Sequence, residues 1–250
     1  MRSNWLILIG AAWLSYSPFS WADKLEDLIS RAEQGDAIAQ TDLGSRYADG
    51  YGVPKDLGKA EKWFKSAAEQ GNPLAEFNIG LMFAHGEGVL LNLKEAKKWF
   101  LKAADRGDEE AQFTLGLMYA DGDGVPRNYQ QAAQWFQVAA AHGHPRAQLN
   151  LGLMAIRGEG VSKNPEVAVN WFKLSAEQGN ASAQYHLGLC YYEGEGVSKD
   201  EQEAYVWFAL AAAQRDDDAY DYLNKLETEL NAKQIADAQK RAANWVPSLH

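Results

Sequence analysis

The residues best suited to acid–base or metal chemistry in this chain are its histidines and its acidic turns. No two histidines stand at i and i+4 beside a carboxylate, the arrangement that holds zinc on one helix face. The turn Asp121-Gly122-Asp123-Gly124 resembles part of a calcium loop, but it lacks the ligand spacing of such loops. We therefore expect no metal site and no cofactor. The histidines considered are His85, His142, His144, His186 and His250.

Nucleophilic catalysis also lacks its usual residues. The chain contains neither the G-x-S-x-G turn of serine hydrolases nor a phosphate-binding G-x-x-x-x-G-K-[ST] loop. Its only cysteine, Cys190, occupies the place in an internal repeat that Met82, Met118 and Met154 hold elsewhere, which indicates a core residue rather than a reactive thiol. We expect the protein not to be an enzyme.

The elements that carry these residues belong to an internal repeat of 36 residues. Tryptophan recurs with this period on one track and glycine on a second, so one supersecondary unit is copied five times. The tryptophans are Trp63, Trp99, Trp135, Trp171 and Trp207, and the glycines are Gly44, Gly80, Gly116, Gly152 and Gly188. The predicted units span residues 36–71, 72–107, 108–143, 144–179 and 180–215.

Each unit has the signals of two antiparallel helices. The first helix is expected to follow an N-cap residue whose side chain accepts a backbone N–H, and His144 fills this place in the fourth unit. A G-x-G-V turn then leads to a second helix, whose apolar positions follow i, i+3, i+4, i+7, i+8. A glycine inside the first helix costs about 1 kcal/mol relative to alanine, so we expect a neighbour too close for a Cβ there. The second-helix N-caps are Asp56, Asn92, Asn128, Asn164 and Asp200.

The ends of the array differ from its repeats, as the caps of a solenoid should. Residues 23–35 are predicted to form an N-terminal capping helix, and residues 216–250 two C-terminal capping helices. Asn231 and Gln234 form a capping-box pattern that opens the last helix. Residues 1–22 resemble a cleavable signal peptide, with a short apolar run followed by Ser20-Trp21-Ala22. We therefore expect a periplasmic protein; secretion, or retention of the segment as an anchor, are the alternatives.

The formal net charge of −10 excludes two classes of partner. Phosphate backbones and anionic membrane surfaces would be repelled, so we expect binding to neither nucleic acid nor membranes. No stretch after the signal is long and apolar enough to span a bilayer.

The repeat resembles the Sel-one-like repeat family, relatives of the tetratricopeptide repeats with a longer turn between helices. The resemblance covers residues 36–215 and rests on A-x-x-x-L-G-x-x-Y, G-x-G-V and A-x-x-W-F-x-x-A-A. The third unit carries all three motifs, with Ala111, Leu115, Gly116, Tyr119, Gly122, Gly124, Val125, Ala132, Trp135, Phe136, Ala139 and Ala140. It implies an all-α fold: a right-handed α-α superhelix of five two-helix repeats with helical caps at both ends. It also implies an adaptor that binds another macromolecule.

Two other functions remain open. Cysteine-rich members of this family are described as penicillin-binding or β-lactam-hydrolysing proteins, which suggests a cell-wall binder or enzyme. This chain lacks their cysteine pairs and any S-x-x-K motif, so their chemistry does not carry over residue by residue. A virulence factor that acts on host proteins is the other alternative.

By analogy with the tetratricopeptide repeats, the first helices are expected to line a concave binding groove. The predicted partner-binding residues are Phe77, Asn78, Phe113, Leu149, Asn150, Tyr185 and His186. The alternative is that the aromatic members only fill the space between adjacent first helices. His85, Arg157 and Tyr192, near the ends of the first helices, are further candidates.

The stacking of units also gives an expectation for stability. Trp135 lies in the middle unit, whereas Trp207 is followed only by the C-terminal cap. Truncation of Trp135 is therefore expected to cost more than truncation of Trp207.

Overall fold

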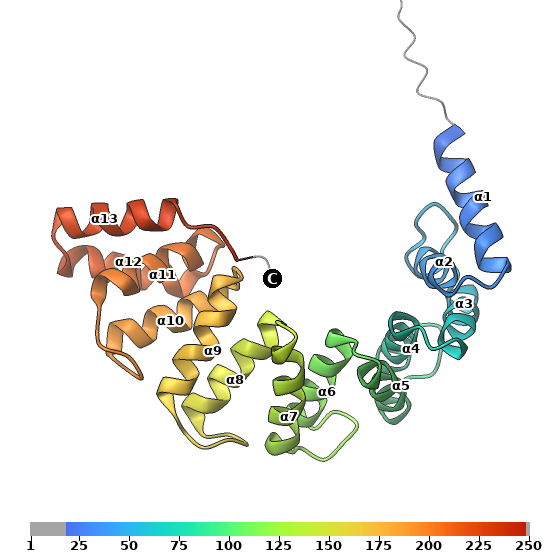
Figure 1. Cartoon of the computed structure of the whole chain (residues 1–250), viewed down its shortest axis with the longest axis horizontal. Coiled ribbons are helices and arrows are strands. Elements are labelled where there is room, and N and C mark those ends of the chain that lie inside the picture. The colour runs from blue at the N-terminus through green and yellow to red at the C-terminus, as the bar shows by residue number, and fades with distance from the viewer. Residues whose placement is uncertain (1–18, 249–250) are drawn as a thin grey trace, which may run out of the picture. The chain divides into compact units, whose positions relative to one another are not determined.

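The computed structural model describes residues 19–248, and the predicted signal peptide lies almost entirely outside this range. The described chain is all α-helix and contains no strand, which confirms the predicted fold class (Figure 1). The described residues divide into two compact units, with the division between Gln70 and Gly71. Unit 1 contains α1 (Phe19–Glu33), α2 (Ala37–Asp49) and α3 (Leu57–Glu69). Unit 2 contains α4 (Pro73–His85), α5 (Leu93–Asp105), α6 (Glu109–Asp121), α7 (Tyr129–Ala141), α8 (Pro145–Arg157), α9 (Pro165–Glu177), α10 (Ala181–Glu193), α11 (Glu201–Ala213), α12 (Asp217–Glu229) and α13 (Ala232–Ala243).

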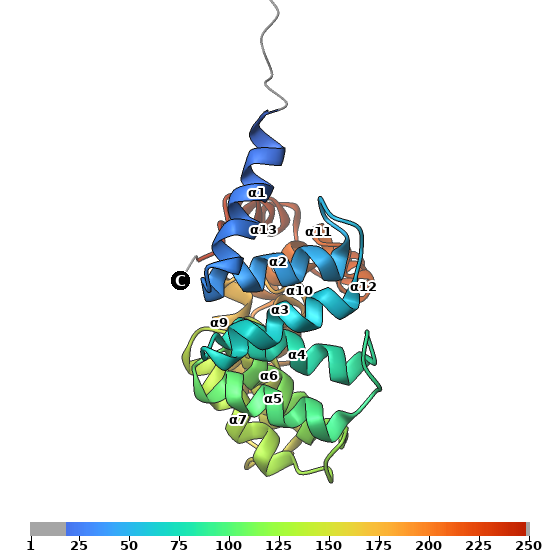
Figure 2. The ribbon, with the colours of Figure 1, turned by 90° about the vertical axis from the view of Figure 1, so that its right-hand side faces the viewer.

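Helix pairs are the building blocks of both units. In unit 1, α2 and α3 lie side by side and α1 packs on α2 (Figure 2). In unit 2, α4 pairs with α5, α6 with α7, α8 with α9 and α10 with α11. Within unit 2, the second helix of a pair contacts the first helix of the next pair, and α12 and α13 both pack on α11. The predicted caps therefore cover the last repeat.

The predicted helix boundaries follow from local capping. Asp56 opens α3 by accepting the Lys59 N–H at 3.0 Å, and His144 opens α8 by accepting the Ala147 N–H through Nδ1 at 3.1 Å. Asn231 and Gln234 form the full capping box at α13. Each first helix of the five repeats ends at a glycine in the left-handed conformation.

The mid-helix glycines make room for a phenylalanine of the second helix. A Cβ on Gly44 would lie 2.7 Å from the Phe64 ring, and the corresponding glycines of the other four repeats are equally close to their phenylalanines. The expected close neighbour is thus confirmed, and it is a ring from the same repeat. These phenylalanines are all buried, at most 2% exposed: Phe64, Phe100, Phe136, Phe172 and Phe208.

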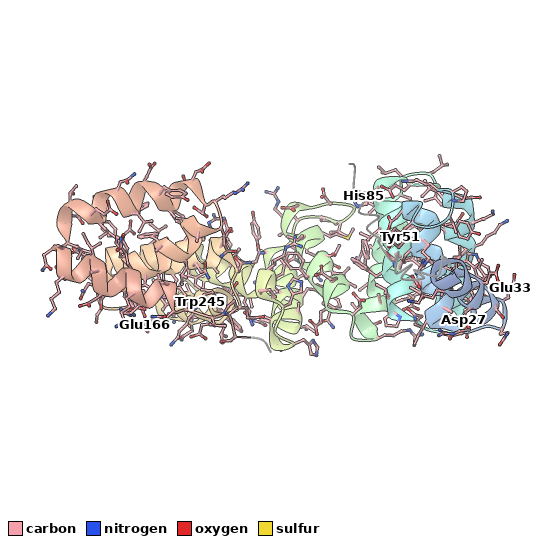
Figure 3. All side chains as sticks on the ribbon, turned by 90° about the horizontal axis from the view of Figure 1, so that it is seen from above. Asp27, Glu33, Tyr51, His85, Glu166 and Trp245 are labelled. Atoms are coloured by element: carbon pink, nitrogen blue, oxygen red, sulfur yellow. The ribbon has the colours of Figure 1, made fainter. Side chains whose placement is uncertain are left out.

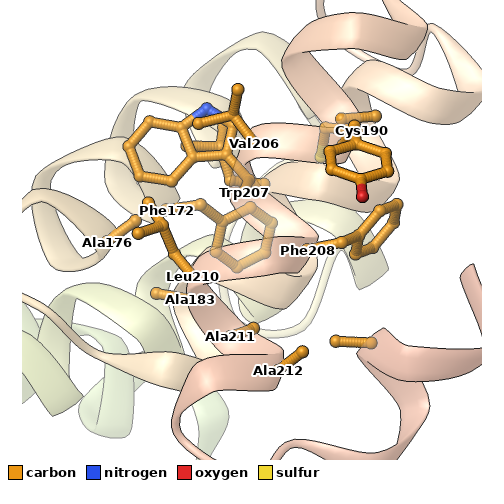
Figure 4. Packing of buried hydrophobic residues seen from close by; sticks show 14 of the residues in the cluster. Phe172, Ala176, Ala183, Cys190, Val206, Trp207, Phe208, Leu210, Ala211 and Ala212 are labelled. Atoms are coloured by element: carbon orange, nitrogen blue, oxygen red, sulfur yellow. The ribbon is translucent and has the colours of Figure 1, made fainter. Parts of the chain in front are cut away.

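The burial of Trp135 and Trp207 is the reverse of what the expected costs of truncating them imply. Trp135 is only partly buried, whereas Trp207 is 7% exposed and lies in the buried cluster of Figure 4. The Trp207 indole N–H donates to Glu203 at 3.0 Å. Glu203 also pairs with Arg241 of α13, so the C-terminal cap covers this end of α11. Burial therefore does not support the expectation that truncation of Trp135 costs more than truncation of Trp207, because Trp207 is the more buried of the two and belongs to the core cluster of the last repeats.

Candidate functional site

Four of the predicted site residues, Phe77, Phe113, Leu149 and Tyr185, occupy the same place in successive first helices. The three aromatic ones pack their rings on the buried phenylalanine of the same repeat. Ring centroids are 5.5 Å apart for Phe77 and Phe100, and 5.9 Å apart for Tyr185 and Phe208. Phe77 and Tyr185 remain partly exposed, as does Leu149. Residues at this position therefore pack mainly against the interior of their own repeat, and only part of each side chain is exposed.

Phe113 is the exception among them, because it is a core residue. It is 2% exposed, with its ring stacked on His144 at 4.6 Å and the Arg146 guanidinium 4.4 Å from its centroid. The alternative noted from the sequence, that an aromatic side chain fills the space between first helices, describes Phe113. In this conformation it offers no surface to a partner, because His144 and Arg146 of the next repeat cover it.

The predicted residues one position further on are no more exposed as a class. Asn78, Asn150 and His186 are all partly buried. His186 stacks on Phe172 of the preceding repeat with centroids 5.3 Å apart. Burial, and then the nearby positive charge of Arg157, lower the pKa of His186, so its imidazole is neutral at pH 7.

An aromatic cluster surrounds His186 at the last repeat. Tyr185 and Tyr222 meet edge to face at 6.0 Å, and Tyr222 does the same with Tyr192 at 5.5 Å. Burial, followed by the charges of Tyr222 and Asp218, raises the pKa of Tyr185 to about 12. Sequence analysis missed Tyr222, although it stands 36 residues after His186 and stacks on Phe208 as His186 stacks on Phe172.

A pocket of about 210 Å³ opens between the ends of α6 and α8. Asn150 lines it together with Arg127 and Arg157. Arg127 donates to the backbone oxygen of Asp121 at 3.3 Å, and Arg157 lies 3.8 Å from the Glu159 carboxylate. Arg127 thus lies at the negative, C-terminal end of α6, and the pocket is lined by charges of both signs.

The structure also contains a ladder of buried amides that sequence analysis missed. Gln148 is 4% exposed; its Nε2 donates to the Ala140 carbonyl at 3.4 Å, and its Oε1 accepts from Gln178 at 2.9 Å. A Gln or Glu recurs at this place every 36 residues, and this periodicity was the available signal. The pairs are Gln40–Gln70, Glu76–Arg106, Gln112–His142, Gln148–Gln178 and Gln184–Gln214.

The described residues give little support for a reactive thiol or a metal site. Cys190 is 4% exposed, and burial, followed by the charges of Glu195 and Glu193, raises the pKa of its thiol to about 12. Residues 19–248 hold no group of three or more His, Cys, Asp or Glu side chains placed to bind a metal ion. No helix in that range has the length and apolar character needed to cross a bilayer. What the described surface offers is a set of partly exposed rings and amides on the first helices.

Comparison with known proteins identifies the repeat. The pattern of the Sel1 repeat matches residues 37–72, 73–108, 109–144, 145–180 and 181–216, each one residue later than the predicted unit. No protein of curated function matches the chain.

Several solved structures are similar. A protective antigen of uropathogenic Escherichia coli strains, described as displaying an SLR fold, has 35% identity and a TM-score of 0.81 over 89% of this chain and 49% of that chain. This chain thus spans about half the length of that relative. A Sel1 repeat protein from Oxalobacter formigenes has 33% identity and a TM-score of 0.78 over 92% of this chain and 96% of its own. An immunity protein from Pseudomonas aeruginosa, at 21% identity and a TM-score of 0.50, covers 79% of this chain and 75% of its own and shares the fold alone.

Proposed function

The chain belongs to the Sel1 repeat family, and we propose that it is a scaffold of the bacterial cell envelope that binds a protein or peptide partner on its first-helix face. It does so without catalysing a reaction. The location outside the cytoplasm rests on the signal-like residues 1–22.

The observation that carries the proposal is the division of the repeat into constant and variable positions. The phenylalanine of the second helix and the glycine it packs against are the same in all five repeats. The first-helix position one residue after the ring position, in contrast, is exposed or partly exposed and varies between repeats: Asp42, Asn78, Thr114, Asn150 and His186. A constant frame with a varying surface is what recognition of a specific partner requires.

Affinity capture from envelope extracts tests the proposal. The variant N78R/N150R places two bulky cations on the first-helix face, and Q134R/Q137R places the same charges on exposed positions of the second helix α7. We expect the native protein and Q134R/Q137R to capture the same partner and N78R/N150R to lose it. Equal capture by both variants, or no partner for the native protein, contradicts the proposal.

A second candidate is a role in contact with a host. It is favoured by the description of the Escherichia coli relative as a protective antigen. Capture from host-cell extracts, with the same pair of variants, distinguishes it from an envelope role. Nitrocefin hydrolysis is the measurement for the enzymatic alternative, and we expect none.

A further inference from the structure

The segment that follows α13 docks on a junction between two repeats. The Ser248 N–H donates to the carbonyl oxygen of Glu177, the last residue of α9, at 2.7 Å. Pro247 and Trp245 lie over Gly179, where an added Cβ would be 3.7 and 3.8 Å from them; Figure 3 labels Trp245. The chain thus holds an extended segment on this junction with one backbone hydrogen bond and two rings.

The equivalent junction 36 residues earlier, at Gly143, has the same backbone groups, and no segment of the described chain covers them. Gly143 corresponds to Gly179, with φ of +95° against +90°, and an added Cβ there would meet nothing within 4 Å. The carbonyl oxygen of Ala141 corresponds to that of Glu177. No group in the described chain donates to it, since the residue four positions on is Pro145, which has no N–H.

The uncovered junction is also hollow and preformed. Gly143 lines a cleft of about 300 Å³ between the ends of two repeats. His144 forms one wall, and its ring is fixed on three sides: it stacks on Phe113, accepts the Ala147 N–H through Nδ1 and donates through Nε2 to Glu110 at 3.2 Å. A segment entering the cleft would therefore meet a wall that needs little reorganisation.

We propose that the cleft at Gly143 binds an extended segment of the partner that carries an aromatic residue and, two positions later, a proline. The residue after the proline donates its backbone N–H to the Ala141 oxygen. The template is this chain's own Trp245-Val246-Pro247-Ser248 on the equivalent junction. The inference rests on the proposed function, because it names the kind of segment that the scaffold recognises.

The test uses the acetylated, amidated peptide Asn-Trp-Val-Pro-Ser with a fluorinated tryptophan, added to the full chain. We expect saturable broadening of the ¹⁹F signal and backbone amide shifts in residues 141–146. A matched peptide with N-methylated serine lacks the donor for Ala141 and should bind about five-fold more weakly, the effect of one exposed hydrogen bond. Replacement of the peptide's proline with alanine should weaken binding as well.

A full-length W245A/P247A variant supplies the positive control, because it uncovers the Gly179 junction for the same peptide. A peptide that binds at Gly179 in this variant but never at Gly143 overturns the inference. Equal affinity of the N-methylated peptide overturns it too, as does no binding to either protein. If the peptide fails while N78R/N150R still abolishes capture of the envelope partner, the proposed function stands and only the cleft assignment falls.

Discussion

Replacement of Gly44 in α2 with alanine should lower the free energy of unfolding, whereas the same replacement of Gly58, an exposed glycine in α3, should raise it. In G44A the new Cβ would lie 2.7 Å from the Phe64 ring, about 0.7 Å inside the 3.4 Å at which ordinary contacts begin. Phe64 is 2% exposed and has no open space to move into. Overpacking of this kind costs about 1–3 kcal/mol, against which alanine regains about 1 kcal/mol of helix propensity. We expect a net loss of about 1 kcal/mol.

The control is G58A in α3, where the nearest atom to the new Cβ is Asp56 Oδ1 at 3.5 Å. This substitution should stabilise unit 1 by about 0.5–1 kcal/mol. Urea unfolding followed by circular dichroism measures both changes, and hydrogen exchange of the α2 and α3 amides assigns them to unit 1. In the F64L background the cost of G44A should shrink, because the ring is gone. If G44A and G58A stabilise the chain alike, the packing argument is refuted.

Three further predictions concern burial. W207A should cost about 3–5 kcal/mol and W135A clearly less, since Trp207 is 7% exposed and Trp135 only partly buried; thermal unfolding of the two variants gives the order. R106Q should cost about 1–3 kcal/mol, because it leaves the 2%-exposed Glu76 carboxylate without its ion pair, and E76Q/R106Q should recover the loss by recreating the glutamine pair of other repeats; urea midpoints test this. Cys190, with its thiol pKa raised to about 12, should resist iodoacetamide at pH 8 until the chain unfolds, as mass spectrometry of the alkylated protein would report.

Most of the fold was predictable because its determinants are local. The N-cap at Asp56 and the capping box at Asn231 depend on atoms within three residues, and both are found where the sequence places them. The need for glycine at Gly44 also follows from the sequence, since a costly residue kept through every copy requires a close neighbour. The identity of that neighbour did not follow, because Trp63 and Phe64 are adjacent and both apolar.

The candidate site was less predictable because its residues are covered by other repeats. Phe113 shares its place with Phe77, yet it is buried by His144 and Arg146, which the next repeat brings over it. Likewise, Trp207 is buried at an end that α13 covers from outside the repeat array. Periodicity predicts what equivalent positions share, and it cannot predict burial that depends on a neighbour's variable residue.

The buried ladder shows where individual repeats acquire different properties without losing the stack. At Gln148 a neutral amide joins the preceding helix to its own repeat, whereas Glu76 at the equivalent place in the second repeat forms an ion pair with Arg106. The fold therefore tolerates different chemistry at each junction, since the buried Gln or Glu keeps a hydrogen-bonding partner that is Gln, His or Arg. The same junctions carry the closing glycines, one of which, Gly179, already holds an extended segment of this chain. The repeats share the same core positions, and the residues at their junctions differ. These junction residues thus give each repeat a different surface.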